Sequence, residues 1–156
     1  MAFDRHNIYI IYEPNLSTYK LTEAFYVRYV NRREKLLDLE LTKKGNQYFA
    51  EIQTDTSDNL IVLNFKNDGL WDNNNNNGYL LHLKSDTSYK INSFSNAANY
   101  FDFYGKYKFG MKNNDIAVIE NYEKEFSLFP ESKIKYLNQY LNVKFRNDSA
   151  NAIKII

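Results

Sequence analysis

The first two thirds of the chain alternate apolar and polar side chains in short runs, separated by clusters of Asn, Asp, Gly, Ser and Pro. Alternation with a period of two is typical of half-buried strands, and such clusters are typical of turns. The strands predicted in this way cover residues 7–13, 23–30, 36–41, 47–53, 60–66, 78–84 and 88–94. Short strands with repeated turns favour an antiparallel sandwich or barrel, and we predict a mainly β, immunoglobulin-like β-sandwich.

The same period continues over "YFDFYGKYKFG", residues 100–110. Four aromatic side chains share one face there with Gly105 among them, namely Phe101, Phe103, Tyr107 and Phe109. A glycine inside a strand marks a bend or a place of close packing. The pattern predicts a further half-buried strand, which would complete a sandwich domain over residues 1–110.

Helical spacing replaces the alternation after residue 110. Asn114 or Asp115 can cap a helix over residues 116–129, and Pro130 ends that segment. The sequence predicts a second helix over residues 131–145 and a small strand over 151–156. The apolar positions at helical spacing are Ile119, Tyr122, Phe126 and Phe129 in the first helix and Ile134, Leu137 and Leu141 in the second. Because no linker rich in Pro, Gly or Ser separates these helices, we predict that a C-terminal extension over residues 111–156 packs on the sandwich.

Length, charge and composition exclude several classes of protein. A chain of 156 residues can bury a sizeable core, and without cysteine it has no disulfide and no thiolate chemistry. Its net charge of +1 gives no electrostatic case for a nucleic acid or an anionic membrane as partner. No apolar run approaches the roughly 20 residues that a membrane span needs. The N-terminal residues do not resemble a signal peptide, which favours a cytoplasmic location.

No catalytic motif stands out in the sequence. It contains no G-x-S-x-G elbow, H-E-x-x-H, P-loop or dinucleotide fingerprint. His6 and His82 stand alone, and we interpret His82 as a surface or hydrogen-bonded strand residue. A calcium-binding loop that begins at residue 72 would need a glycine at Asn77 and a glutamate at Leu83. We therefore predict that the protein is not an enzyme and uses neither a cofactor nor a metal.

Residues 65–83, "FKNDGLWDNNNNNGYLLHL", contain the only tryptophan and five consecutive asparagines. Codon slippage in an AT-rich genome explains the length of the asparagine run. Asparagine also offers a donor and an acceptor without a charge, so it can pair with adjacent hydroxyl groups of a sugar. It tolerates left-handed backbone geometry, which suits tight turns. A glucosyl ring could stack on the plane of Trp71.

The order Trp71, Asp72 and asparagines, with Tyr79 eight residues after the tryptophan, resembles a known signature. It is the W-D-N-N-x-G-x-N-Y signature of starch- and glycogen-binding modules, carbohydrate-binding families 21, 25 and 53. The upstream "AFYVRYV" is similar to their V-x-V-R-Y strand, so the resemblance covers residues 23–84. The sequence departs from the signature at Asn76 and Gly78, and "NRREKLL" replaces an aromatic after the V-R-Y strand. The resemblance implies non-catalytic binding of an α-glucan by Trp71, Asn73, Asn74, Asn75, Asn77 and Tyr79.

The same residues also have a structural interpretation. Trp71 and Tyr79 can belong to the core, and Asp72 with Asn73 can brace the turn by accepting hydrogen bonds from backbone amides. The protein would then be a β-sandwich adaptor or structural subunit that binds another protein, for which the C-terminal extension is one candidate surface, and it would bind no sugar. The exposure of Trp71 distinguishes these two hypotheses.

Overall fold

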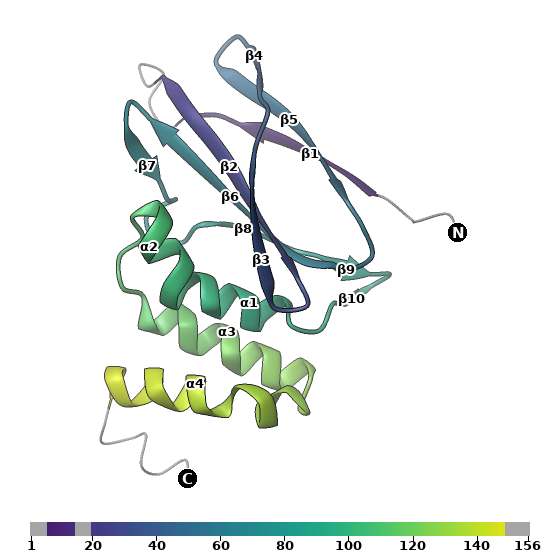
Figure 1. The fold of residues 1–156 in the computed structure, drawn as a ribbon, viewed down its shortest axis with the longest axis vertical. Helices are drawn as coiled ribbons and strands as arrows, with labels where there is room; N and C mark the ends of the chain where they lie inside the picture. Colours follow the sequence, from purple (N-terminus) through teal and green to yellow (C-terminus); the bar gives the residue numbers. More distant parts are fainter. Residues whose placement is uncertain (1–5, 15–19, 149–156) are drawn as a thin grey trace.

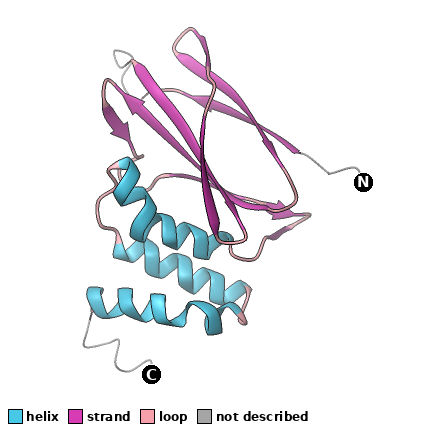
Figure 2. Cartoon of the chain, viewed as in Figure 1, coloured by secondary structure: helices cyan, strands magenta, loops and turns pink. Residues whose placement is uncertain are grey.

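Two large antiparallel sheets, a small two-stranded sheet and a layer of helices form the fold, as a computed structural model of residues 6–14 and 20–148 shows (Figures 1 and 2). The three-stranded sheet has the order β1–β5–β4, and the central sheet has the order β3–β2–β6–β7, with β8 also paired to β6. The strands are β1 (His6–Tyr12), β2 (Leu21–Val30), β3 (Arg33–Asp38), β4 (Thr42–Lys44), β5 (Gln47–Thr54), β6 (Asp58–Asn67), β7 (Leu70–Asp72), β8 (Tyr79–His82), β9 (Lys84–Ser85) and β10 (Ser88–Tyr89). The helices are α1 (Ser93–Asn99), η1 (Tyr100–Tyr104), α2 (Gly105–Phe109), α3 (Asp115–Leu128) and α4 (Ser132–Asn147). The protein is thus mainly β with a C-terminal helical part, and the strand predicted over residues 151–156 lies outside the described residues.

Strand β6 lies at the centre of the molecule and is buried on both faces. Leu60 and Val62 pack into a core shared with the helices, whereas Ile61, Leu63 and Phe65 pack into a second core beneath the three-stranded sheet. Consecutive apolar residues are what a strand covered on both faces requires. The central sheet is therefore the middle of three layers, with the helices on one side (Figure 1).

Residues 93–109 are helical, so the strand predicted over residues 100–110 was wrong. The strand predicted over residues 88–94 is present only as β10, and α1 begins at Ser93. The error has a geometric cause. In a helix, residues four or eight positions apart lie on the same face. In a strand, every second residue lies on the same face, so residues four or eight positions apart do so as well. The spacing of the aromatic residues in this segment therefore fits both elements.

The aromatic side chains of this segment divide between the two sides of the helix. Phe101 and Phe109 are buried, whereas Phe103 and Tyr107 are exposed. Gly105 lies on the buried side, where an added Cβ would be 2.9 Å from the carbonyl oxygen of Tyr100. The close packing predicted at Gly105 is therefore confirmed, although the element is a helix.

Both predicted C-terminal helices are confirmed. Asn114 caps α3 by accepting a hydrogen bond from the backbone amide of Ala117, and α4 begins after Pro130. Of the three apolar positions predicted at helical spacing in α4, Leu137 and Leu141 are partly buried and pack against the core, whereas Ile134 is 91% exposed. The buried face of α4 consists of Tyr136, Tyr140 and Val143.

Tyrosine can occupy this inner face because each hydroxyl group finds an acceptor. The Tyr136 hydroxyl donates to Oδ1 of Asn92 at 2.6 Å, and the Tyr140 hydroxyl donates to Oε1 of Glu123 at 2.8 Å. A buried tyrosine with a bonded hydroxyl contributes a large apolar ring without an unsatisfied polar atom.

The division into a domain over 1–110 and an extension over 111–156 stays a prediction.

Candidate functional site

The asparagine loop, residues 73–78 between β7 and β8, contains three consecutive residues in the left-handed region. Asn74, Asn75 and Asn76 have φ angles of 53°, 53° and 68°, and Gly78 has a φ of 67°. The amide of Asn77 donates to the carbonyl of Asn74, and the amide of Gly78 donates to that of Asn73. Asparagine and glycine adopt this geometry at the lowest cost, so the backbone of the loop accounts for its composition.

Asp72 fixes the start of this loop through a network of hydrogen bonds. Its carboxylate accepts the Tyr12 hydroxyl at 2.6 Å, the Tyr79 hydroxyl at 3.1 Å and the Asn74 amide at 3.1 Å. The amide group of Asn67 donates in turn to the Tyr12 hydroxyl at 2.6 Å. Burial raises the pKa of both tyrosines above the ordinary value, and the neighbouring carboxylate raises it further. Both hydroxyls therefore stay protonated as donors.

Three of the loop side chains form hydrogen bonds with backbone groups of the protein, two of them within the loop and one with Lys112. Oδ1 of Asn73 accepts the Asn76 amide at 3.0 Å, and Nδ2 of Asn74 donates to the Gly78 carbonyl at 3.0 Å. The Asn76 side chain accepts from the Lys112 amide at 2.7 Å and donates to the Lys112 carbonyl at 3.2 Å. The bracing expected of Asp72 and Asn73 is confirmed. The role of Asn76, which clamps the loop to the connection between α2 and α3, was not foreseen.

Trp71 and Tyr79, the two predicted aromatic contacts, lie on opposite faces of the central sheet. Trp71 is half-buried in the core shared with the helices, and its ring centroid is 5.0 Å from that of Phe109 in an edge-to-face arrangement. Tyr79 is half-buried in the other core, 5.5 Å from Phe65. Nζ of Lys66 lies 5.3 Å from the Trp71 ring centroid and covers part of it. The structure does not bring the two aromatic rings together as one stacking surface.

Asn75 and Asn77 are the predicted site residues that remain exposed. The six predicted site residues therefore fall into two groups, according to whether their side chains are already engaged within the protein or are exposed. One group, Trp71, Asn73, Asn74 and Tyr79, is engaged in packing or internal hydrogen bonds. The other group, Asn75 and Asn77, faces solvent at the tip of the loop.

The two fully buried carboxylates in the described residues both have structural partners. Glu125 accepts the backbone amides of Asn92, Phe94 and Ser95 at the start of α1, and also the Ser132 hydroxyl of α4. These bonds satisfy orphan amides at a helix N-terminus and join three helices. Asp58 forms a bidentate pair with Arg28, at 2.6 and 3.0 Å. Neither carboxylate is free to act on a substrate.

His82 is a hydrogen-bonded structural residue, as the sequence led us to expect. Its Nδ1 lies 2.9 Å from Oγ of Ser93, and the Ser93 hydroxyl donates to the Asn59 carbonyl at 2.8 Å. Because the hydroxyl proton is committed, Nδ1 of His82 carries the proton of the histidine–serine bond. Burial against Phe94, whose ring stacks at 4.2 Å, lowers the pKa of His82 to about 4. A histidine that activates a serine accepts the proton of the serine hydroxyl, whereas His82 donates a proton to Ser93. The pair is therefore not arranged as a catalytic base and its nucleophile.

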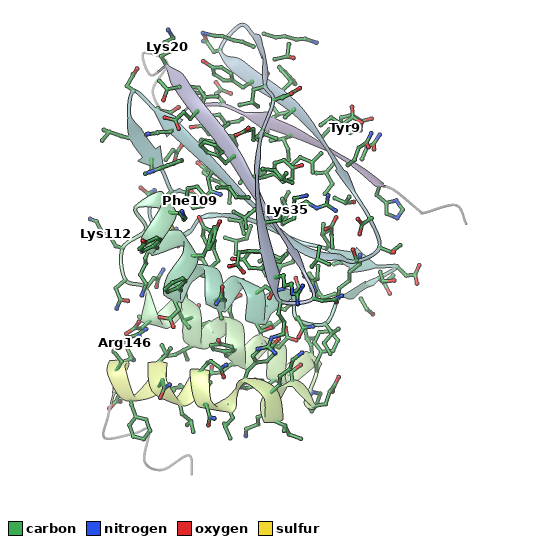
Figure 3. The ribbon with its side chains drawn as sticks, viewed as in Figure 1. Tyr9, Lys20, Lys35, Phe109, Lys112 and Arg146 are labelled. Atoms are coloured by element: carbon green, nitrogen blue, oxygen red, sulfur yellow. The ribbon has the colours of Figure 1, made fainter. Side chains whose placement is uncertain are left out.

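The outer face of the three-stranded sheet carries apolar side chains that sequence reasoning did not single out. Tyr9 is 72% exposed and Ile11 is 63% exposed, and they lie opposite Glu51 and Phe49 of β5. Figure 3 shows Tyr9 projecting away from the sheet. The available signal was the β1 sequence itself, "HNIYIIY", which is apolar at consecutive positions although one face of β1 is exposed.

A depression of about 520 Å³ lies on this outer face. Tyr9, Leu41 and Phe49 contribute its larger apolar side chains, and its polar lining consists of Glu40, Thr42, Lys44 and Glu51. Nζ of Lys44 lies 5.5 Å from the Phe49 ring centroid. The lining is therefore mixed, with apolar and polar side chains next to each other.

Comparison with known proteins does not extend these observations. No protein-family model matches the chain, and no curated protein matches it. Within residues 6–14 and 20–148, no group of three or more histidine, aspartate or glutamate side chains could hold a metal ion. In the same part of the chain, no helix combines the length and the apolar character that crossing a membrane requires.

Proposed function

We propose that the protein is a non-catalytic protein-binding module, an adaptor or a structural subunit, and that it binds a partner with the outer face of its three-stranded sheet. One observation carries this proposal. Tyr9 and Ile11 are exposed side by side on this face, next to a depression, while most polar side chains of the asparagine loop are turned into the fold.

Burial of these side chains would drive binding. Covering an exposed tyrosine or isoleucine gains about 1.5–3 kcal/mol each, and aromatic residues are enriched at the centres of protein interfaces. Glu51 and Lys44 in the lining of the depression would remain hydrated and would select the partner by charge. We prefer this face to the C-terminal extension, because the exposed Ile134 of α4 stands between Lys133 and Lys135.

Peptide-display selection on the immobilised protein tests the proposal. We expect the wild type to enrich extended apolar or aromatic sequences that do not bind the double variant Y9K/I11K. The matched control is I134K, which removes an exposed apolar side chain from another surface. The proposal fails if no sequence is enriched, or if Y9K/I11K retains every enriched sequence while I134K loses them.

Binding of an α-glucan through the asparagine loop is the second candidate function. It is favoured by the exposed Asn75 and Asn77 and by the part of the Trp71 ring that remains exposed. Affinity would be weak, since one partly covered ring and two flexible amides must offset the ordering of a polysaccharide. Isothermal titration with maltoheptaose and glycogen tests it. Heat of binding that the N75A/N77A variant abolishes would favour the glucan, and no heat with the wild type would exclude it.

The immunoglobulin-like class of the sandwich and the cytoplasmic location belong to the proposal as well. The supporting feature of the sandwich is its pair of antiparallel sheets around one shared core. A location in the cytoplasm fits a chain without cysteine, and fluorescence microscopy of a tagged full-length chain in its own cells would test it.

A further inference from the structure

Strand β1 lies at the edge of the three-stranded sheet. Among the described strands it pairs with β5 alone, in an uninterrupted register from His6 opposite Thr54 to Tyr12 opposite Tyr48. Without a bulge, its outer edge is a straight row of backbone N–H and C=O groups. Such an edge is a template for another strand, and native proteins usually protect it.

The other sheet edges in the described residues are protected in the ways expected of monomeric proteins. The edge strand β3 alternates charges along "REKLLD", and β4 has two lysines in three residues. Strands β7, β8, β9 and β10 have only two to four residues each. Strand β1, in contrast, has seven residues and no formal charge from Asn7 to Tyr12. Among the edge strands that the structure describes, β1 is the long one with neither a charge after His6 nor a bulge.

The β1 sequence is complementary to itself in antiparallel orientation. A two-fold axis perpendicular to the sheet requires opposed residues to lie on the same face, and an axis through Ile10 satisfies this condition. Tyr9 then faces Ile11 of the second copy, and Ile11 faces Tyr9. On the other face, Ile8 opposes Tyr12. Aromatic and β-branched side chains in direct cross-strand positions stabilise a sheet.

The ends of this pairing are also compatible. Asn7 lies opposite Glu13 of the second copy, so an amide donor faces a carboxylate acceptor, and no two like charges oppose each other. An axis through Tyr9 would instead place Asn7 against Ile11. The register centred on Ile10 therefore brings the exposed apolar side chains into cross-strand contact on the outer face and leaves polar residues at the ends.

We propose that two copies of this chain pair along their β1 strands, antiparallel and centred on Ile10. The pairing joins the three strands of each copy into one six-stranded sheet. This inference rests on the proposed function and names the partner as a second copy. Edge pairing buries less than the about 1,200 Å² of a standard interface, so we expect a weak dimer whose population depends on concentration.

Sedimentation equilibrium tests the dimer at protein concentrations from roughly 5 to 500 µM, a range over which a weak association becomes populated. We expect the wild type to shift from monomer to dimer, and Y9K/I11K to stay monomeric because the introduced lysines face each other twice. The charge-swap variant Y9K/I11E should recover the dimer, because each introduced lysine then faces an introduced glutamate. I134K should behave like the wild type.

Each outcome supports or overturns the inference. A wild type that stays monomeric overturns self-pairing, and so does a dimer that persists in Y9K/I11K or a Y9K/I11E variant that stays monomeric. If the wild type is monomeric but display selection enriches peptides that need Tyr9 and Ile11, the proposed function stands and only the second copy is excluded. If both experiments are negative, both proposals fail. Far-UV circular dichroism confirms that each variant is folded.

Discussion

The asparagine loop and strand β1 use their side chains in opposite ways. The loop is polar throughout. The side chains of Asn73, Asn74 and Asn76, and of Asp72 directly before the loop, nevertheless form hydrogen bonds within the protein. Strand β1 is apolar, yet every second residue of it faces solvent. The comparison teaches that residue type does not tell which groups are available to a ligand. Availability depends on whether the fold has already supplied a partner.

Removal of the Asp72 carboxylate should have the largest effect on the polar side of this comparison. In D72A the buried Tyr12 hydroxyl and the Tyr79 hydroxyl lose their acceptor, and an unsatisfied buried group costs about 1–3 kcal/mol. We expect the free energy of unfolding to fall by about 3 kcal/mol, measured by urea titration. N77A, which changes an exposed residue of the same loop, should stay within about 0.5 kcal/mol of the wild type. Equal losses in the two variants would show that the brace does not stabilise the fold.

The Asn76 clamp allows two contributions to be separated. N76A loses both hydrogen bonds to Lys112 and places alanine at a φ of 68°. N76G loses the same bonds but tolerates this φ, whereas N75A has only the backbone cost. We expect losses of about 2 kcal/mol for N76A and about 1 kcal/mol for each of the others. If N76G is as stable as the wild type in thermal unfolding, the clamp contributes nothing.

His82 is a third polar residue that the fold has already used, and it adds a pH dependence. Its pKa in the folded state is about 4, below the ordinary value of about 6.5, so the unfolded chain binds more protons between these values. The stability that neutral His82 provides is therefore fully present above pH 6.5 and is lost as the pH falls toward 4.

We expect about 1–2 kcal/mol from this histidine, reduced from the full linkage value because the ring is partly exposed. The measurement is urea unfolding of the wild type and H82Q at a series of pH values from 7 to 4. The carboxylates of both proteins titrate alike, so the difference between the two curves isolates His82. A difference that does not change with pH would contradict the assignment.

The elements of this fold that could be predicted are those whose sequence pattern fits only one type of secondary structure. Strand β6 has four consecutive apolar residues, Leu60 to Leu63, next to turn residues, and α3 has a cap, helical spacing and a proline after its end. The segment over residues 100–109 has a pattern with two solutions, because its aromatic spacings fit a strand and a helix alike. The burial of Tyr136 in α4 could not be predicted, because the acceptor of its hydroxyl bond is Asn92, a residue 44 positions away in the sequence.

The candidate site was partly predictable for the same reason. Bracing by Asp72 and Asn73 acts within a few residues, so the local sequence was sufficient to suggest it. The Asn76 clamp joins residues 36 positions apart, and no local pattern reveals such a pair. The exposure of Tyr9 depends on the outer face of the three-stranded sheet being uncovered, and the packing of layers is a property of the assembled fold.

We expect the smallest effect on stability from substitutions of the exposed apolar residues of strand β1. Y9K/I11K changes two side chains that the monomer leaves mostly exposed, so we expect its free energy of unfolding to stay within about 0.5 kcal/mol of the wild type. The urea titration should use a concentration of about 1 µM, so that a dimer does not contribute. I10K is the matched control, because Ile10 is the neighbouring buried residue of the same strand and a lysine there should cost about 3 kcal/mol or more.

A large loss in Y9K/I11K would mean that Tyr9 and Ile11 already hold the monomer together, and the outer face would then offer no unused apolar surface to a partner. A small loss in I10K would mean that β1 is not seated on its core, which would remove the edge on which both proposals depend. The expected contrast between adjacent residues, with Ile10 essential and its two neighbours dispensable for folding, is the condition under which β1 can hold its own fold and bind a second strand.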